Sequence, residues 1–130
     1  MLAMPKAPTI AIVDDDEGVR TSLASLVRSL GYHARTYQSG VHFLRDSLDP
    51  DCMIADIQMR VMTGDEMQAL LIAAGRRFPI IFMTAFPTES VRKRVMEAGA
   101  YCYLSKPASG DEIIRCLEDA LADGHPQRSQ

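Results

Sequence analysis

Four short apolar runs and one more polar run, His33–Tyr37, alternate along the chain with five segments in which apolar residues recur at helical spacing. The expected strands are Thr9–Val13, His33–Tyr37, Cys52–Ala55, Pro79–Met83 and Tyr101–Leu104. Continuous apolar runs of this length are typical of parallel strands covered by helices on both faces, and each crossover between such strands is right-handed. The alternation therefore predicts an α/β protein with a doubly wound, five-stranded parallel sheet and five helices.

Capping residues and helical spacing place the helices and the domain limits. The expected helices run from about Val19 to Leu30, from Ser39 to Leu48, from Gly64 to Ala74, from Thr88 to Ala98 and from Ser109 to Leu121. Ser39 and Thr88 are the expected N-caps, and Leu48 and Leu70 are expected to face inward. Residues 1–8 are interpreted as a leader, residues 9–122 as one domain and residues 123–130 as a flexible tail.

Composition excludes several classes of protein. The chain has 130 residues, of which 47% are hydrophobic, so it can fill one core. Its formal charge of −3 argues against the basic surface that a nucleic-acid binder usually carries. Three cysteines without a Cys-x-x-Cys pair indicate neither a disulfide framework nor a zinc site. No segment resembles a signal peptide or a membrane span. We therefore expect a cytoplasmic protein that binds neither nucleic acid nor membrane directly.

Charged residues stand where the expected strands end. Asp14 and Asp15 follow the first strand, Asp56 follows the third, and Lys106 closely follows the fifth. Because ligands of open α/β sheets bind outside the carboxyl ends of the strands, we expect these side chains to meet at one edge. Carboxylates with phosphate oxygens and waters are the usual ligands of Mg²⁺, and a bound cation would keep clustered carboxylates ionised.

One of these carboxylates is a candidate nucleophile. Asp56 stands alone at the end of a central strand, whereas Asp14 and Asp15 are adjacent and are better placed to share a metal ion. An ionised aspartate beside a cation can attack phosphorus and form an aspartyl phosphate. Lys106 would then neutralise phosphoryl oxygens, Thr84 could donate a hydrogen bond to them, and the small Ala85 would leave room for the group.

The spacing of these residues resembles the receiver domain of two-component response regulators from about Thr9 to Leu121. The matching parts are Val13-Asp14-Asp15, Asp56 with Gly64 eight residues later, Met83-Thr84-Ala85 and Lys106-Pro107. Four parts at compatible spacing are specific, although each alone would be weak. The resemblance implies a flavodoxin-like sheet with strand order 2-1-3-4-5.

The resemblance also implies how the acidic residues act. Asp56 is expected to accept a phosphoryl group from a phosphohistidine of a sensor histidine kinase or a histidine phosphotransfer protein. Asp15, Asp56 and the backbone carbonyl of Gln58 are the expected Mg²⁺ ligands, with Asp14 acting largely through a bound water.

A second group of residues is implied to read the phosphate. Thr84 and Lys106 resemble the family's switch pair, Tyr103 occupies its aromatic switch position, and the Lys106–Pro107 bond is expected to be cis. Their movement would reshape the surface of the fourth helix, fifth strand and fifth helix, where homodimers or downstream partners dock. This is a shift between two packings of the domain.

Four positions adjust this expectation. Arg60 stands where the family commonly has a proline, so the loop after Asp56 loses a fixed φ angle and gains a charge near the site. Ala108 replaces a frequent aromatic residue, which should loosen packing at the start of the last helix. Gln58 and Phe86 match positions that tune phosphate lifetime, and the large apolar Phe86 is expected to shield the acyl phosphate from water.

Two other functions remain open. A small Mg²⁺-dependent phosphatase of the haloacid dehalogenase type also uses an aspartate nucleophile, but its motif needs a second aspartate where this chain has Gln58. A docking module that works unphosphorylated would share the fold. Either a stand-alone regulator or the receiver part of a transcriptional regulator fits the sequence.

Overall fold

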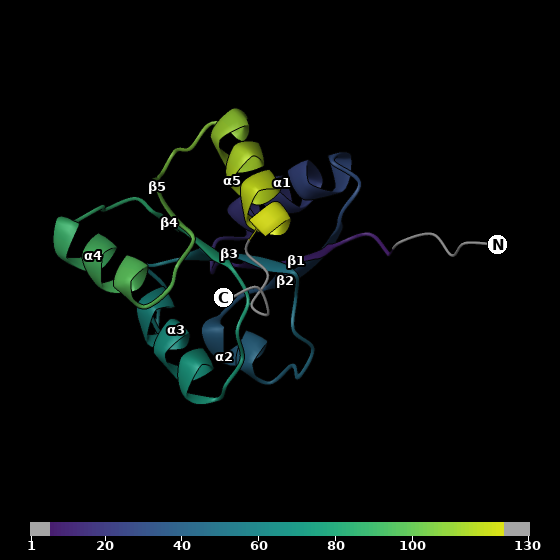
Figure 1. Cartoon of the computed structure of the whole chain (residues 1–130). Coiled ribbons are helices and arrows are strands. Elements are labelled where there is room, and N and C mark those ends of the chain that lie inside the picture. Colours follow the sequence, from purple (N-terminus) through teal and green to yellow (C-terminus); the bar gives the residue numbers. More distant parts are fainter. Residues whose placement is uncertain (1–5, 124–130) are drawn as a thin grey trace.

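The computed structural model describes residues 6–123, which form a five-stranded parallel sheet in the order β2-β1-β3-β4-β5 with helices on both sides (Figure 1). The elements are β1 (Thr9–Val13), α1 (Glu17–Ser29), β2 (His33–Tyr37), α2 (Gly40–Leu44), β3 (Cys52–Asp56), α3 (Gly64–Ala73), β4 (Ile80–Thr84), α4 (Glu89–Glu97), β5 (Cys102–Ser105) and α5 (Gly110–Asp123). The predicted doubly wound fold and strand order are confirmed.

The sheet separates two apolar clusters. In β1, Ile10 and Ile12 pack in the cluster that contains the buried residues of α1 and α5, whereas Ala11 and Val13 pack in the cluster that contains those of α2, α3 and α4. Figure 1 shows the same division, with α1 and α5 on one side of the sheet and the other three helices opposite. Because successive strand side chains point to opposite faces, a strand buried on both sides reads as a continuous apolar run.

Polar side chains cap the helices as the sequence indicates. The Oγ atoms of Ser39 and Thr88 accept hydrogen bonds from backbone N–H groups in the first turns of α2 and α4, so both predicted N-caps are confirmed. At the start of α5, Ser109 and Glu112 exchange two hydrogen bonds, each side chain accepting from the other residue's backbone N–H group. These bonds satisfy donors that a helix N-terminus would otherwise leave free.

The second helix is shorter than expected. It ends at Leu44, and Leu48, expected to face inward, is 62% exposed. The carboxylate of Asp46 accounts for this difference because it accepts hydrogen bonds from the Tyr37 hydroxyl at 2.6 Å, from Arg35 at 3.1 Å and from the Leu48 backbone at 3.1 Å. An aspartate that binds its own backbone two residues later favours a turn over a helix.

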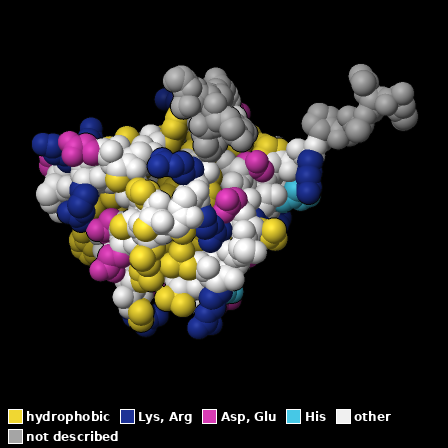
Figure 2. Space-filling view, turned by 60° about the horizontal axis from the view of Figure 1, so that its bottom comes forward, with side chains coloured by type: hydrophobic (Ala, Val, Ile, Leu, Met, Phe, Trp, Pro, Cys, Tyr) yellow, Lys and Arg dark blue, Asp and Glu magenta, His cyan; other side chains and the backbone are white. Residues whose placement is uncertain are grey.

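One residue of the third helix that was expected to face inward is exposed. Leu70 is 48% exposed, and the prediction that it faces inward is wrong. Gln68 is buried with Met67 and Leu71 instead, and its side-chain amide donates to the backbone oxygen of Val95 at 3.1 Å. This hydrogen bond to α4 satisfies a polar group that would be costly to bury alone. Figure 2, in which the side of α2 and α3 comes forward, shows hydrophobic side chains on this face of the molecule.

Several boundaries differ by one residue from the sequence expectation. The strands β3, β4 and β5 each end one residue later than expected, so that Asp56 and Thr84 are the last residues of their strands. Near the C-terminus, α5 continues to Asp123, a residue that was expected to lie in the tail. Residues 1–5 of the expected leader and residues 124–130 of the expected tail lie outside the described part. Within residues 6–123, the structure has no helix with the length and hydropathy needed to cross a bilayer.

The loop between β3 and α3 holds a residue in an unfavourable conformation. Val61 has a φ of 71° and is 96% exposed. A β-branched residue in the left-handed region is strained, and no burial of this side chain compensates for the strain. The strained residue directly follows Arg60, which stands where the family commonly has a proline that would fix the φ angle.

Gly64 allows α3 to begin directly against the strand that ends in Asp56. A Cβ atom at this position would overlap the backbone oxygen of Asp56 and would lie 3.0 Å from the Phe82 ring. Gly64→Ala should therefore lower the free energy of unfolding by about 2 kcal/mol or more, since backbone atoms cannot give way cheaply. Urea denaturation measures this change.

Gly110→Ala is the matched control because a Cβ atom at Gly110, the first residue of α5, meets open space. It should leave stability unchanged or raise it by less than about 1 kcal/mol. Equal unfolding midpoints for the two variants would contradict the close packing of Gly64.

Candidate functional site

Three carboxylates meet at the carboxyl edge of the sheet. Asp14 follows β1, Asp56 ends β3, and the two strands are neighbours. Carboxylate oxygens of Asp14, Asp15 and Asp56 lie within 4.8 Å of one another. Asp14 and Asp56 are 2% and 6% exposed, while Asp15 is half-buried. Three oxygen ligands at this separation fit a divalent cation such as Mg²⁺.

The side chain of Lys106 joins two of these carboxylates. Its Nζ atom lies 3.0 Å from Oδ2 of Asp14 and 3.4 Å from Oδ2 of Asp56. Lys106 follows β5, and its peptide bond to Pro107 is cis, as expected. One ammonium group therefore lies between two buried anions that would otherwise repel each other.

Burial and neighbouring charges change the pKa values of Asp56 and Lys106. Burial, followed by the charge of Asp14, raises the pKa of Asp56 to about 6, although Lys106 opposes the shift. Burial alone would lower the pKa of Lys106, but hydrogen bonds and charges from Asp14 and Asp56 outweigh it and raise that pKa. At neutral pH, Asp56 is thus largely ionised beside a fully protonated lysine.

The other contacts of the acidic residues fix their positions. Asp14 accepts a hydrogen bond from the Asp16 backbone at 2.9 Å through Oδ1, and its carbonyl oxygen accepts one from Arg20 at 2.8 Å. Oδ2 of Asp15 accepts a hydrogen bond from the Arg60 backbone at 3.2 Å and lies 3.6 Å from Nε of Arg60. The charge expected near the site from Arg60 is therefore present. The side chain of Asp16 caps α1 by accepting a hydrogen bond from the backbone N–H of Val19 at 2.9 Å.

Thr84 has two hydrogen-bond partners beside Asp56. Its Oγ1 donates to Oε1 of Gln58 at 2.6 Å and accepts from the Phe86 backbone at 3.0 Å. The backbone N–H of Gln58 donates to Oδ1 of Asp56 at 3.3 Å. The sequence assigned to Gln58 a carbonyl ligand of Mg²⁺ and a role in phosphate lifetime, but the bond from Thr84 to its side chain was missed. A long amide two residues after Asp56 was the only signal for this contact.

The remaining candidate residues surround this centre. Ala85 is exposed, and the ring of Phe86 is 70% exposed. Tyr103 is half-buried on β5, and its hydroxyl accepts a hydrogen bond from the backbone N–H of Thr88 at 3.3 Å. Because Thr88 is the N-cap of α4, this bond links the expected aromatic switch residue to the start of α4.

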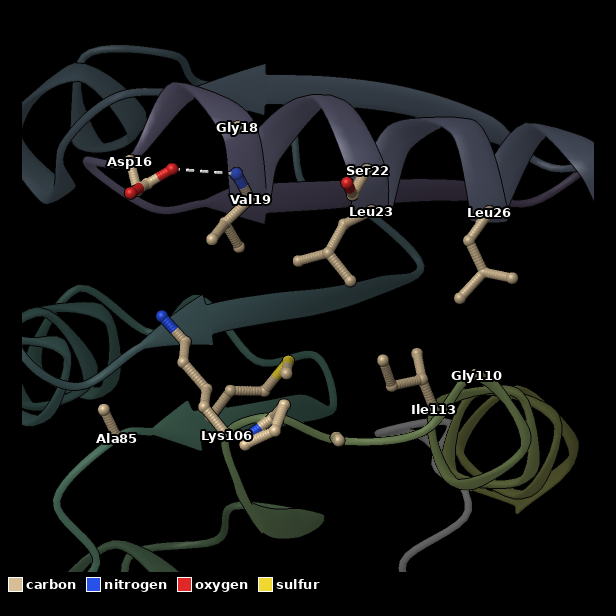
Figure 3. A pocket seen from close by; sticks show the side chains of 13 residues that line it. Asp16, Gly18, Val19, Ser22, Leu23, Leu26, Ala85, Lys106, Gly110 and Ile113 are labelled. Atoms are coloured by element: carbon tan, nitrogen blue, oxygen red, sulfur yellow. Dashed lines mark hydrogen bonds between the residues drawn. The ribbon is translucent and has the colours of Figure 1, made fainter.

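A groove of about 840 Å³ between α1 and α5 adjoins the site (Figure 3). Leu23 and Leu26 of α1 point into it from one side and Ile113 of α5 from the other, and Lys106 lies at its end nearest the site. Ala108 also lines the groove. Ala108 also packs against the apolar cluster of α1 and α5, and the loose packing expected from this small residue stays a prediction.

The response regulator receiver domain family matches residues 10–118 of the chain. The chain belongs to this family. The receiver domain is 34% identical over 114 residues to the response regulator protein TmoT of Ectopseudomonas mendocina, covering 86% of this chain and 52% of that protein. It is 31% identical over 129 residues to the transcriptional regulatory protein FixJ of Azorhizobium caulinodans, covering 98% of this chain and 61% of FixJ. The chain thus spans only part of the length of these relatives.

Solved structures show the same likeness. The crystal structure of FixJ-N superposes with a TM-score of 0.82 at 30% identity, covering 92% of this chain and 97% of that one. The response regulator StyR superposes with a TM-score of 0.83 at 33% identity, covering 94% of this chain and 63% of that one. The resemblance expected from the sequence motifs is confirmed for both sequence and fold.

The raised pKa of Asp56 predicts a stability that depends on pH. The folded receiver domain holds a proton on Asp56 more tightly than the unfolded chain does, because the pKa is about 6 instead of 3.8. Ionised Asp56 therefore destabilises the fold above about pH 6, and this cost fades as the pH falls toward about 4. Asp56→Asn should stabilise the metal-free domain by about 1–2 kcal/mol at about pH 8, after allowance for partial solvation.

Urea denaturation in the presence of a chelator measures this gain at about pH 8 and pH 4.5. The gain should be largest at the higher pH. Asp119→Asn, which changes an exposed aspartate of α5, should shift stability by less than about 0.5 kcal/mol at either pH. A gain from Asp56→Asn that is the same at both values would contradict the assignment.

Proposed function

We propose that this receiver domain accepts a phosphoryl group on Asp56 from a phosphohistidine of a sensor histidine kinase or a histidine phosphotransfer protein. The supporting observation is that the Lys106 ammonium group lies 3.0 Å from Asp14 and 3.4 Å from Asp56 within the acidic cluster. This arrangement places a nucleophile, a cation-binding pair and a counter-ion for phosphoryl oxygens within a few ångströms.

In the proposed reaction, a carboxylate oxygen of Asp56 attacks the phosphorus atom. The bond between phosphorus and the partner's histidine nitrogen breaks, the nitrogen keeps the electron pair, and the imidazole is released. The ionised state that this attack needs is favoured at neutral pH, since the pKa of Asp56 is about 6. Lys106 would move its contact from the Asp56 carboxylate to a phosphoryl oxygen, so its positive charge stays paired.

Asp14, Asp15, Asp56 and the backbone carbonyl of Gln58 would hold Mg²⁺. The cation would supply charge neutralisation for phosphoryl oxygens. Among the residues described, the acidic cluster consists of Asp14, Asp15 and Asp56. The Arg60 backbone already occupies one oxygen of Asp15 at 3.2 Å, so the other oxygens of the cluster are the better ligands.

The proposed response begins at Thr84. Its hydroxyl would donate to a phosphoryl oxygen, with the exposed Ala85 leaving space for the group. Tyr103 would then give up its hydrogen bond to Thr88 and change the start of α4. The surface formed by α4, β5 and α5 would be altered, and this surface is the proposed site of homodimerisation or partner docking.

We infer that any DNA binding resides in another domain or another protein. The relative FixJ is a transcriptional regulatory protein, but the chain covers 61% of its length and carries a formal charge of −3. Direct contact with nucleic acid or a lipid bilayer is not part of the proposal. The proposed setting is the cytoplasm, where histidine kinases present their phosphohistidine to receivers.

Incubation with acetyl phosphate and Mg²⁺ tests the main proposal. Intact-mass measurement should show one added phosphoryl group per chain in the wild type and none in Asp56→Asn, because the substitution removes the carboxylate proposed to attack phosphorus. Asp119→Asn, with its exposed carboxylate, should be labelled like the wild type.

Two results would favour the other functions. Repeated hydrolysis of a phosphate monoester without stoichiometric labelling would support the phosphatase. Failure of beryllofluoride with Mg²⁺ to alter the NMR spectrum would support an unphosphorylated docking module.

Phe86 is proposed to set the lifetime of the phosphoryl group. Its backbone N–H donates to Oγ1 of Thr84 at 3.0 Å, which places Phe86 beside the residue that would contact the phosphoryl group. Phe86→Ser should shorten the lifetime of the phosphorylated domain several-fold, because a small polar residue admits water to the acyl phosphate. Loss of label over time after removal of the donor measures this lifetime.

Leu48→Ser is the matched control for Phe86→Ser, since it also removes an exposed apolar side chain, 62% exposed in this case, but before β3 and away from the site. It should leave the lifetime unchanged. Equal lifetimes of Phe86→Ser and the wild type would reject the shielding role.

A further inference from the structure

The single donor of the Thr84 hydroxyl group is already engaged in the described structure. It is buried, with 0% exposure, and its Oγ1 atom donates to Oε1 of Gln58 at 2.6 Å while accepting from the Phe86 backbone at 3.0 Å. A hydroxyl has a single proton to donate. Thr84 therefore cannot keep its bond to Gln58 and also donate to a phosphoryl oxygen on Asp56.

Gln58 makes hydrogen bonds to both Asp56 and Thr84. Its backbone N–H donates to Oδ1 of Asp56 at 3.3 Å, and its side-chain oxygen accepts from Thr84. The residue thus bridges the ends of β3 and β4, which are adjacent strands. Gln58 itself is exposed, so its amide can exchange Thr84 for water without leaving a buried polar group unpaired.

We propose that the side-chain amide of Gln58 is a positioning residue that holds the Thr84 hydroxyl in the unphosphorylated state. The phosphoryl group would have to displace it before Thr84 can respond. This inference rests on the proposed function, because it assumes that Thr84 donates to a group on Asp56. Gln58 then sets how strongly phosphorylation is converted into the change at Thr84.

The competition has a consequence for binding. A ligand can shift a two-state equilibrium only through its different interactions with each state. A hydrogen bond made only in the unphosphorylated state weakens the binding of every ligand that needs the Thr84 hydroxyl. Removal of this bond should strengthen the binding of such ligands. Since a neutral hydrogen bond has a modest net effect, we expect a change of roughly 2- to 10-fold in affinity.

Beryllofluoride, an analogue of the phosphoryl group, is the probe for this effect. Its dissociation constant is measured by NMR titration at saturating Mg²⁺ for the wild type, Gln58→Met, Thr84→Val and the double variant. Methionine keeps the length of the side chain but removes the amide oxygen. Gln58→Met should bind beryllofluoride roughly 2- to 10-fold more tightly than the wild type.

The double variant separates this role from a general effect of the substitution. In the Thr84→Val background, Gln58→Met should change the dissociation constant by less than about twofold, because the bond it would remove is already absent. Gln38→Met, which alters another exposed glutamine, should have no effect on the wild type. An unchanged affinity in Gln58→Met, or an equal change with and without the Thr84 hydroxyl, would overturn the proposal.

The proposed function can fail separately. If the wild type does not bind beryllofluoride, the phosphoacceptor function is contradicted, and the hydrogen bond is then tested in the unmodified protein. Thr84→Val should shift the side-chain amide resonances of Gln58 and make this side chain more mobile. Unaltered resonances would exclude the bond itself.

Discussion

The contact of one lysine with two buried aspartates is the interaction on which the rest of the site depends. Lys106 reaches Asp14 at 3.0 Å and Asp56 at 3.4 Å, and it does so from the far side of β4. Without a cation, two carboxylates at the ends of neighbouring strands would repel each other and oppose the pairing of β1 with β3. The ammonium group makes this edge of the sheet compatible with folding, although the pKa of Asp56 stays raised to about 6.

Most of the fold and the acidic centre could be predicted because both follow from short-range patterns. The apolar runs defined the strands, and the rule that parallel strands end at one edge brought Asp14, Asp56 and Lys106 together. Leu48 and Leu70 were misplaced because tertiary hydrogen bonds, those of Asp46 and Gln68, decided which residues of their segments face inward. Periodicity does not contain such bonds.

The site residues beyond the motifs were harder to predict for the same reason. The bond from Thr84 to Gln58 joins two strands and depends on the rotamer of a long, exposed side chain. Arg60 was expected near the site from its position in the loop, yet its attachment to Asp15 through the backbone could not be read from residue type. The motifs of the family identify residue types at given spacings, whereas these contacts depend on loop conformation and side-chain rotamers.

The sheet also acts as a partition between two layers. Alternation along β4 and β5 places Thr84 on the same face as Phe82, and the cluster on that face includes Tyr103 and the buried residue of α4, whereas Met83 and α1 lie on the opposite face. A rearrangement that starts at Thr84 would therefore enter the layer of Tyr103 and α4 first, and of the opposite layer only α5 belongs to the surface proposed to change. A partner that touches only α1 would meet the same surface before and after the change, so a single domain can offer one contact that stays constant and another that depends on its state.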